Sequence, residues 1–201
     1  MTFTMPRTLP SQVTGPVVSV LARLGVTPNM LTVAQLIGGI GAAILIGTGE
    51  LAWGGIALLA AASLDAFDGT LARTTGQATK FGAVFDSVID RLFEGAVLGG
   101  ILYYYLDRAD RTGSMLAFVT VVGSLCVSYV RARAEGEGVE LYDGLFTRVV
   151  RILLLTLGLV AGLLTPVLWL LAVMTIATTF QRLFVVWLKL RTQPPLPRAN
   201  P

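Results

Sequence analysis

The chain has 201 residues, of which 54% are hydrophobic and only 13% are charged, whereas a soluble domain carries about a quarter charged residues. A soluble protein this apolar would expose large aggregating patches, so the composition favours a membrane protein. The absence of histidine excludes histidine-ligated zinc and serine–histidine triads, and the single cysteine excludes an intrachain disulfide. The net charge of +3 comes from short segments between apolar runs, which indicates membrane topology rather than nucleic-acid binding.

We expect an all-α integral membrane domain over residues 29–191, because six apolar stretches reach the length of about 20 residues that crosses a bilayer. Before it, residues 1–28 contain a segment, 11–24, whose apolar residues share one helical face. We interpret this segment as an amphipathic helix in the membrane interface, with packing on the bundle as the alternative. The proline-rich tail 192–201 is predicted to be disordered. The predicted spans cover residues 29–48, 51–73, 82–106, 114–135, 145–164 and 166–190.

Basic residues predict which ends of the spans face the cytoplasm. Lysine and arginine occur before the first span, between the second and third, around the connection of the fourth and fifth, and after the sixth. The opposite loops hold Glu50, a mixed-charge segment at 107–111, and no charge between the fifth and sixth spans. The positive-inside rule therefore places both termini, and the loop between spans two and three, on the cytoplasmic side of the cell membrane.

Four aspartates, Asp65, Asp68, Asp86 and Asp90, interrupt the apolar pattern near that cytoplasmic loop. Each charge within a span costs about 2.5–3.5 kcal/mol on insertion scales, so such residues mark functional sites. Spacings of three and four residues put each pair on one helix face, and a short connection makes the two helices antiparallel neighbours. Carboxylates that face one point repel, and a divalent cation such as Mg²⁺, Mn²⁺ or Ca²⁺ removes that conflict. On these residues alone, a cation transporter or channel is an alternative to an enzyme.

The complete motif extends beyond the aspartates. It reads Asp65-Ala-Phe-Asp68-Gly69-Thr-Leu-Ala72-Arg73, then eight residues, then Gly82-Ala-Val-Phe-Asp86-Ser-Val-Ile-Asp90. It fills every position of D-x2-D-G-x2-A-R-x8-G-x3-D-x3-D, and so it resembles the signature of the CDP-alcohol phosphatidyltransferase family. The six-span layout of that family also fits nearly the whole chain. The resemblance implies attack by a hydroxyl on a CDP-linked lipid, release of CMP, and a homodimer. It also implies two metal ions, Mg²⁺ or alternatively Mn²⁺: Asp65 and Asp86 would bridge both, Asp68 would complete one, and Asp90 the other while serving as general base.

The same resemblance implies a set of residues that bind the CDP-lipid. Gly69 lies on the Asp65 face and leaves room for a nucleotide. Arg73 would pair with the diphosphate, with a cytoplasmic anchor as its alternative role. Thr79 would contact the nucleotide by its position in the family. Upstream, Thr27-Pro28-Asn29-Met30-Leu31-Thr32 resembles the segment that opens the first span, and Asn29, Met30, Leu31 and Thr32 would touch the CDP moiety. Independently, Thr27 followed by proline predicts a helix start.

The acceptor alcohol is predicted from residues that separate branches of the family. Ser87 and Arg91 stand where relatives that use glycerol phosphate tend to carry proline and lysine, and they resemble the inositol-phosphate branch. The segment Thr147-Arg148-Val-Val-Arg151 keeps the arginine spacing of relatives but lacks their neighbouring acids and proline. We therefore predict phosphatidyl transfer from CDP-diacylglycerol to inositol phosphate, with a phosphatidylglycerophosphate-type enzyme as the alternative. The cations expected to bind the acceptor phosphate are Arg131, Arg148, Arg151 and Arg182.

Overall fold

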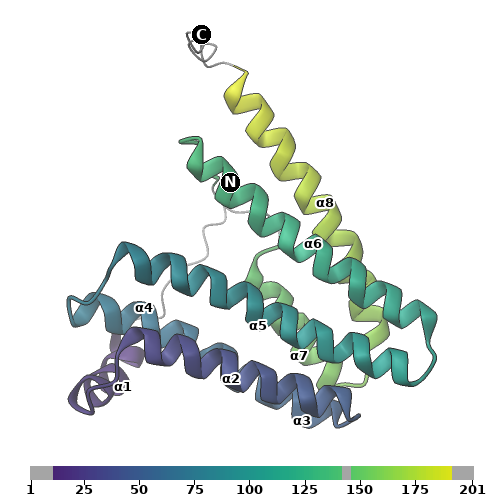
Figure 1. Ribbon diagram of the computed structural model, residues 1–201, viewed down its shortest axis with the longest axis horizontal. Helices are drawn as coiled ribbons and strands as arrows, with labels where there is room; N and C mark the ends of the chain where they lie inside the picture. Colours follow the sequence, from purple (N-terminus) through teal and green to yellow (C-terminus); the bar gives the residue numbers. More distant parts are fainter. Residues whose placement is uncertain (1–10, 142–145, 192–201) are drawn as a thin grey trace, which may run out of the picture.

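The computed structural model describes residues 11–141 and 146–191, and this part of the chain forms eight α-helices and no β-strand (Figure 1). The expected all-α class is therefore confirmed for the described residues, whereas the predicted tail 192–201 lies outside them. In chain order the helices are α1 (Ser11–Arg23), α2 (Pro28–Gly47), α3 (Leu51–Ser63), α4 (Asp65–Thr74), α5 (Lys80–Asp107), α6 (Arg111–Gly136), α7 (Arg148–Val160) and α8 (Leu164–Leu190).

Four stretches of the described chain are long and apolar enough to cross a membrane: Pro28–Gly47, Leu51–Thr74, Arg111–Gly136 and Leu164–Leu190. Large apolar side chains are exposed along these helices, as expected for surfaces that face lipid. The protein is therefore an integral membrane protein. Two of the six predicted spans are not in this set: α5 is long but rich in charged residues in its first half, and α7 has only 13 residues.

The predicted fifth span, 145–164, ends too late. Helix α7 ends at Val160, and Gly162 follows with φ +70°, a left-handed conformation that terminates helices and favours glycine. The next helix then begins at Leu164, two residues before the predicted start at Pro166, because proline is tolerated in the first turn of a helix. Hydropathy continues across this turn, so the apolar pattern placed the break between the two spans too late.

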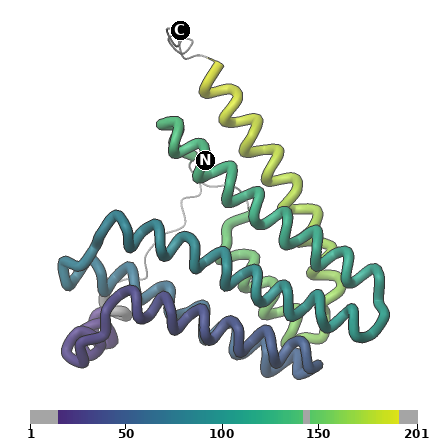
Figure 2. Tube along the Cα trace, viewed as in Figure 1, coloured from purple at the N-terminus to yellow at the C-terminus, as the bar shows by residue number. Residues whose placement is uncertain are grey.

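The long helices pack side by side, and the C-terminal parts of α6 and α8 extend together beyond the rest (Figure 2). Helix α2 packs against α3 and α5, α5 against α6, α6 against α8, and α7 against α3 and α8. Small residues allow the close crossing of α2 and α5. A Cβ atom added to Gly39 would lie 2.4 Å from the ring of Phe93, and one added to Gly100 would lie 2.4 Å from the backbone oxygen of Ala43. This packing holds α2 directly beside the part of α5 that carries the predicted metal ligands Asp86 and Asp90.

The predicted amphipathic segment near the N-terminus forms helix α1. Helix α1 contacts α4, and its Val18 is buried in a small apolar cluster with Leu31 of α2 and Leu71 of α4. The helix therefore packs on the bundle through this face. Its location in the membrane interface stays a prediction.

The stretch Leu51–Thr74 is broken at Leu64, between α3 and α4. The backbone N–H of Leu64 donates to the oxygen of Ala61, three residues back, which tightens the turn. The hydroxyl of Ser63 donates to the oxygen of Ala60 at 2.7 Å and thereby satisfies a carbonyl group at the break. As a result, α4 begins at Asp65, and its first turn carries two of the four predicted metal ligands.

Candidate active site

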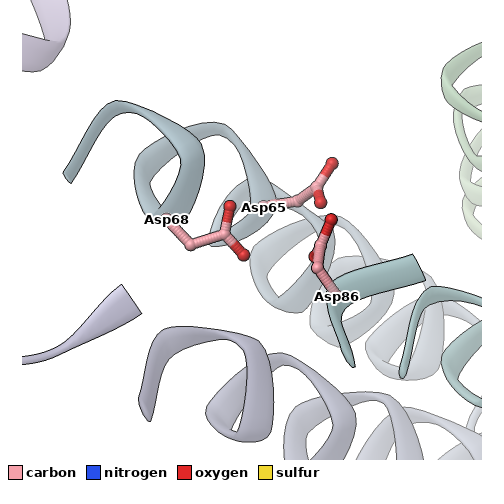
Figure 3. Close-up of side chains that lie close together, drawn as sticks. All are labelled: Asp65, Asp68 and Asp86. Carbon is pink, nitrogen blue, oxygen red and sulfur yellow. The ribbon is translucent and has the colours of Figure 1, made fainter. Parts of the chain in front are cut away.

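Three aspartates from two helices converge on one point. Asp65 and Asp68 come from the first turn of α4, and Asp86 comes from α5 (Figure 3). Each offers one carboxylate oxygen, and these three oxygens lie within 4.8 Å of one another. Oxygen ligands in such a group suit Mg²⁺ or Mn²⁺. The structure thus brings together three of the four predicted ligands.

The fourth aspartate, Asp90, lies one turn further along α5 and joins the cluster through an arginine. Atom Nη1 of Arg148 lies 2.8 Å from Oδ1 of Asp90 and 3.1 Å from Oδ2 of Asp65. Atom Oδ1 of Asp86 is buried and has no hydrogen-bond partner among the described residues. An unsatisfied carboxylate oxygen inside a group of carboxylates is costly unless a cation binds it, so these residues fit a divalent metal.

Helix α2 orients two of the aspartates through hydrogen bonds from its side chains. The hydroxyl of Thr32 donates to Oδ2 of Asp68 at 3.1 Å, and Nε2 of Gln35 donates to Oδ1 of Asp90 at 3.3 Å. Both donors are fully buried. Partners of this kind fix the orientation of metal ligands. Our sequence reasoning missed Gln35, although it is the only residue with a polar side chain between Thr32 and Thr48, and such residues within spans are typical of functional sites.

Asp68 and Asp86 border a cavity of about 240 Å³, whose lining also includes Ala72 and Gln77. Gly69 opens onto it, because a Cβ atom there would approach only Arg73, at 3.5 Å. Two of the residues predicted to touch the CDP moiety are not part of the lining: Met30 is 56% exposed, and Leu31 is buried in the cluster with α1. The other predicted CDP-lipid residues line the cavity, namely Asn29, Thr32, Gly69, Arg73 and Thr79.

A second cavity, of about 330 Å³, shares Ala83 and Asp86 with the first. Its polar lining includes Asp90, Glu94, Ser128 and all four arginines expected to bind the acceptor phosphate: Arg131, Arg148, Arg151 and Arg182. Arg131 forms an exposed ion pair with Glu135 at 2.8 Å, and Nη1 of Arg182 donates to the backbone oxygen of Val127 at 2.8 Å. Two cavities, one beside the aspartate motif and one rich in arginine, therefore meet at Asp86.

Arg151 forms a bidentate ion pair that is almost fully buried. Atoms Nε and Nη2 donate to the two carboxylate oxygens of Glu94, each at 2.7 Å, and Nη1 donates to the backbone oxygen of Phe146 at 3.2 Å. Both side chains are buried, and the pair joins α5 to α7. The role of Arg151 in phosphate binding stays a prediction. Our sequence reasoning also missed Glu94, although it is a charged residue one turn after Asp90 in an increasingly apolar run.

Comparison with known proteins yields a consistent set of relatives. The model of the CDP-alcohol phosphatidyltransferase family matches residues 25–189. The phosphatidylinositol phosphate synthase of Mycobacteroides abscessus is 35% identical over 92% of this chain and 86% of its own length. The enzyme of the same name from Corynebacterium glutamicum is 38% identical over 84% of this chain and 81% of its own length.

Solved structures agree with these relatives. The crystal structure of Mycobacterium tuberculosis phosphatidylinositol phosphate synthase with CDP-DAG bound matches with a TM-score of 0.82 and 32% identity, over 88% of this chain and 94% of that chain. The structure of the same enzyme in complex with manganese and citrate matches with a TM-score of 0.79 and 31% identity, over 87% of this chain and 88% of that chain.

Proposed function

Because the chain belongs to the CDP-alcohol phosphatidyltransferase family, we propose that it transfers the phosphatidyl group of CDP-diacylglycerol to inositol phosphate and releases CMP. The observation that carries this proposal is the pair of cavities that meet at Asp86, one bordered by the signature motif and the other lined by arginines. The relatives compared above are named phosphatidylinositol phosphate synthases, and these names support the same acceptor.

The proposed site uses a divalent metal, and we assign it two Mg²⁺ ions, with Mn²⁺ as an alternative. Asp65, Asp68 and Asp86 would hold one ion, and Asp90 would complete the second together with the shared Asp65 and Asp86. Two bound cations supply charge stabilisation at the attacking and leaving oxygens of a phosphoryl transfer. The oxygen-only donor set and the manganese complex of the Mycobacterium tuberculosis relative support a hard divalent ion.

We assign one group of residues to the CDP-lipid and another group to the acceptor. Asn29, Thr32, Gly69, Arg73 and Thr79 would line the nucleotide end of the CDP-lipid. Asp90, oriented by Gln35, would accept the proton of the attacking hydroxyl. Aspartate is a weak base, so activation of that hydroxyl by a cation must contribute. Arg131, Arg148, Arg151 and Arg182 would hold the acceptor phosphate, since guanidinium groups suit phosphate oxygens.

We further propose that α5 and α7 cross the membrane together with the four apolar spans, which gives six spans. Their packing supports this arrangement, because α5 lies between α2 and α6, and α7 contacts α3 and α8. Helix α1 would lie in the interface, and the site and both termini would face the cytoplasm by the positive-inside rule. Residues 1–28, 29–191 and 192–201 would form the N-terminal segment, the catalytic domain and the tail. The family resemblance also implies a homodimer.

The proposal is tested with purified protein in detergent, CDP-diacylglycerol, Mg²⁺ and a panel of alcohols, with CMP release as the readout. We expect CMP only when lipid, metal and inositol phosphate are all present. Preference for glycerol phosphate would replace the acceptor assignment by a phosphatidylglycerophosphate-type activity. Cation flux into vesicles without any CDP-lipid, together with no CMP release, would favour the transporter alternative.

A further inference from the structure

Arg148, the first residue of α7, makes an unusual contact with the aspartate cluster. One of its nitrogens, Nη1, serves two carboxylates at once, Oδ2 of Asp65 at 3.1 Å and Oδ1 of Asp90 at 2.8 Å. Its side chain is 20% exposed, and its guanidinium lies 5.5 Å from the ring centre of Phe93. A single cationic group thus bridges a residue of α4 and a residue of α5.

The rest of this guanidinium is poorly satisfied. Atoms Nε and Nη2 of Arg148 are buried and have no hydrogen-bond partner among the described residues. A well-matched arginine–carboxylate pair uses two parallel N–H bonds, as Arg151 does with Glu94. The contrast indicates that charge, rather than a matched hydrogen-bond geometry, holds Arg148 against Asp65 and Asp90. Such a contact is easier to displace than the fork between Arg151 and Glu94.

We infer that Arg148 is an internal counter-ion for Asp65 and Asp90, and that a divalent cation must displace it to bind between these two residues. The inference rests on the proposed function, which assigns Asp65 and Asp90 to the second metal ion. Two cationic groups that face the same carboxylates repel each other, so Arg148 and this ion compete. Because Arg148 also lines the arginine-rich cavity, its displacement leaves its guanidinium available to the acceptor phosphate.

The inference makes an unusual prediction: removal of a charged residue strengthens metal binding. In full-length protein in detergent, free Mn²⁺ is measured by electron paramagnetic resonance during a titration. We expect Arg148→Gln to bind Mn²⁺ about tenfold or more tightly than the wild type at the site between Asp65 and Asp90. The reason is that a charge within 4–6 Å shifts equilibria at a carboxylate by about 1–3 decades. Arg148→Lys keeps the charge and should stay near the wild-type affinity.

The matched control is Arg133→Gln, which removes an exposed arginine of α6 that forms an ion pair with Glu137 at 2.6 Å. This variant should leave Mn²⁺ affinity unchanged. A second readout is thermal unfolding with EDTA or with saturating Mn²⁺. The stabilisation by Mn²⁺ should be larger for Arg148→Gln than for the wild type, because tighter binding to the folded state raises stability further. If Arg148→Gln unfolds in EDTA, its recovery by Mn²⁺ is the expected result, and a failure to recover counts against the inference.

The outcomes separate this inference from the proposed function. Equal or weaker Mn²⁺ binding by folded Arg148→Gln, while the wild type binds the ion, would overturn the role of Arg148 and leave the metal site intact. An equal increase in Arg148→Lys would also overturn it, because the charge would then not be the cause. A wild-type protein that binds no Mn²⁺ would instead overturn the metal-dependent function on which the inference rests.

Discussion

Replacement of Glu94 by glutamine tests whether the ion pair between Glu94 and Arg151 ties α5 to α7. The two side chains are 7% and 3% exposed, and two bonds of 2.7 Å join them. A broken buried pair leaves an uncompensated charge, which costs about 3–5 kcal/mol. Replacement of both partners by apolar groups of similar size is often neutral. We therefore expect Glu94→Gln to be strongly destabilised, and Glu94→Leu combined with Arg151→Met to recover most of the lost stability.

The assay is denaturant unfolding in detergent, with the free energy of unfolding compared across the wild type, each single variant and the double variant. If Arg151 also binds the acceptor phosphate, the double variant will be stable but will have a raised KM for inositol phosphate. If Arg151 is purely structural, the double variant will be stable and will keep its KM. A loss of less than about 1 kcal/mol in Glu94→Gln, or a double variant as unstable as the single variants, would refute the reasoning.

Four further predictions concern the site directly. Asp65→Asn should abolish CMP release while circular dichroism stays native, because the residue would be shared by two ions; a near-wild-type rate would exclude that role. Gln35→Leu should lower kcat about tenfold or more with little change in KM, since Asp90 loses its buried donor; steady-state kinetics check this. Gly69→Leu should raise the KM for CDP-diacylglycerol by filling the cavity, whereas Gly69→Ala, with only a 3.5 Å contact, should be tolerated in the same assay. Arg182→Ala should raise the KM for inositol phosphate roughly ten- to a hundredfold while the KM for CDP-diacylglycerol stays flat, and the exposed Arg133→Ala should change neither.

The local parts of the site could be predicted from the sequence because helix geometry fixes them. Asp65 and Asp68 had to share a face at a spacing of three residues, and the short connection to Asp86 made convergence the natural expectation. The start of α2 followed in the same way, because Thr27 accepts a hydrogen bond from the backbone N–H of Met30, as an N-cap should. These features depend on near neighbours in the chain.

Contacts between distant segments could not be predicted in this way. The bond between Gln35 and Asp90 spans 55 positions, and the pair of Glu94 with Arg151 spans 57. Both depend on how α5 packs against α2 and α7, which periodicity does not encode. Packing between distant segments also explains why only part of the predicted CDP-lipid segment 29–32 lines the cavity. Leu31 faces α1 rather than the cavity because Val18 covers it.

The sharing of Asp86 by the two cavities has a consequence for the order of events in catalysis. Two adjoining cavities can hold donor and acceptor at the same time, so neither substrate has to leave before the other arrives. On the proposed function, the acceptor oxygen then attacks phosphorus from the face opposite the departing CMP, without an enzyme-bound lipid in between. Initial-velocity plots should intersect rather than run parallel, and a CDP-lipid made chiral at the reacting phosphorus should give a product of inverted configuration.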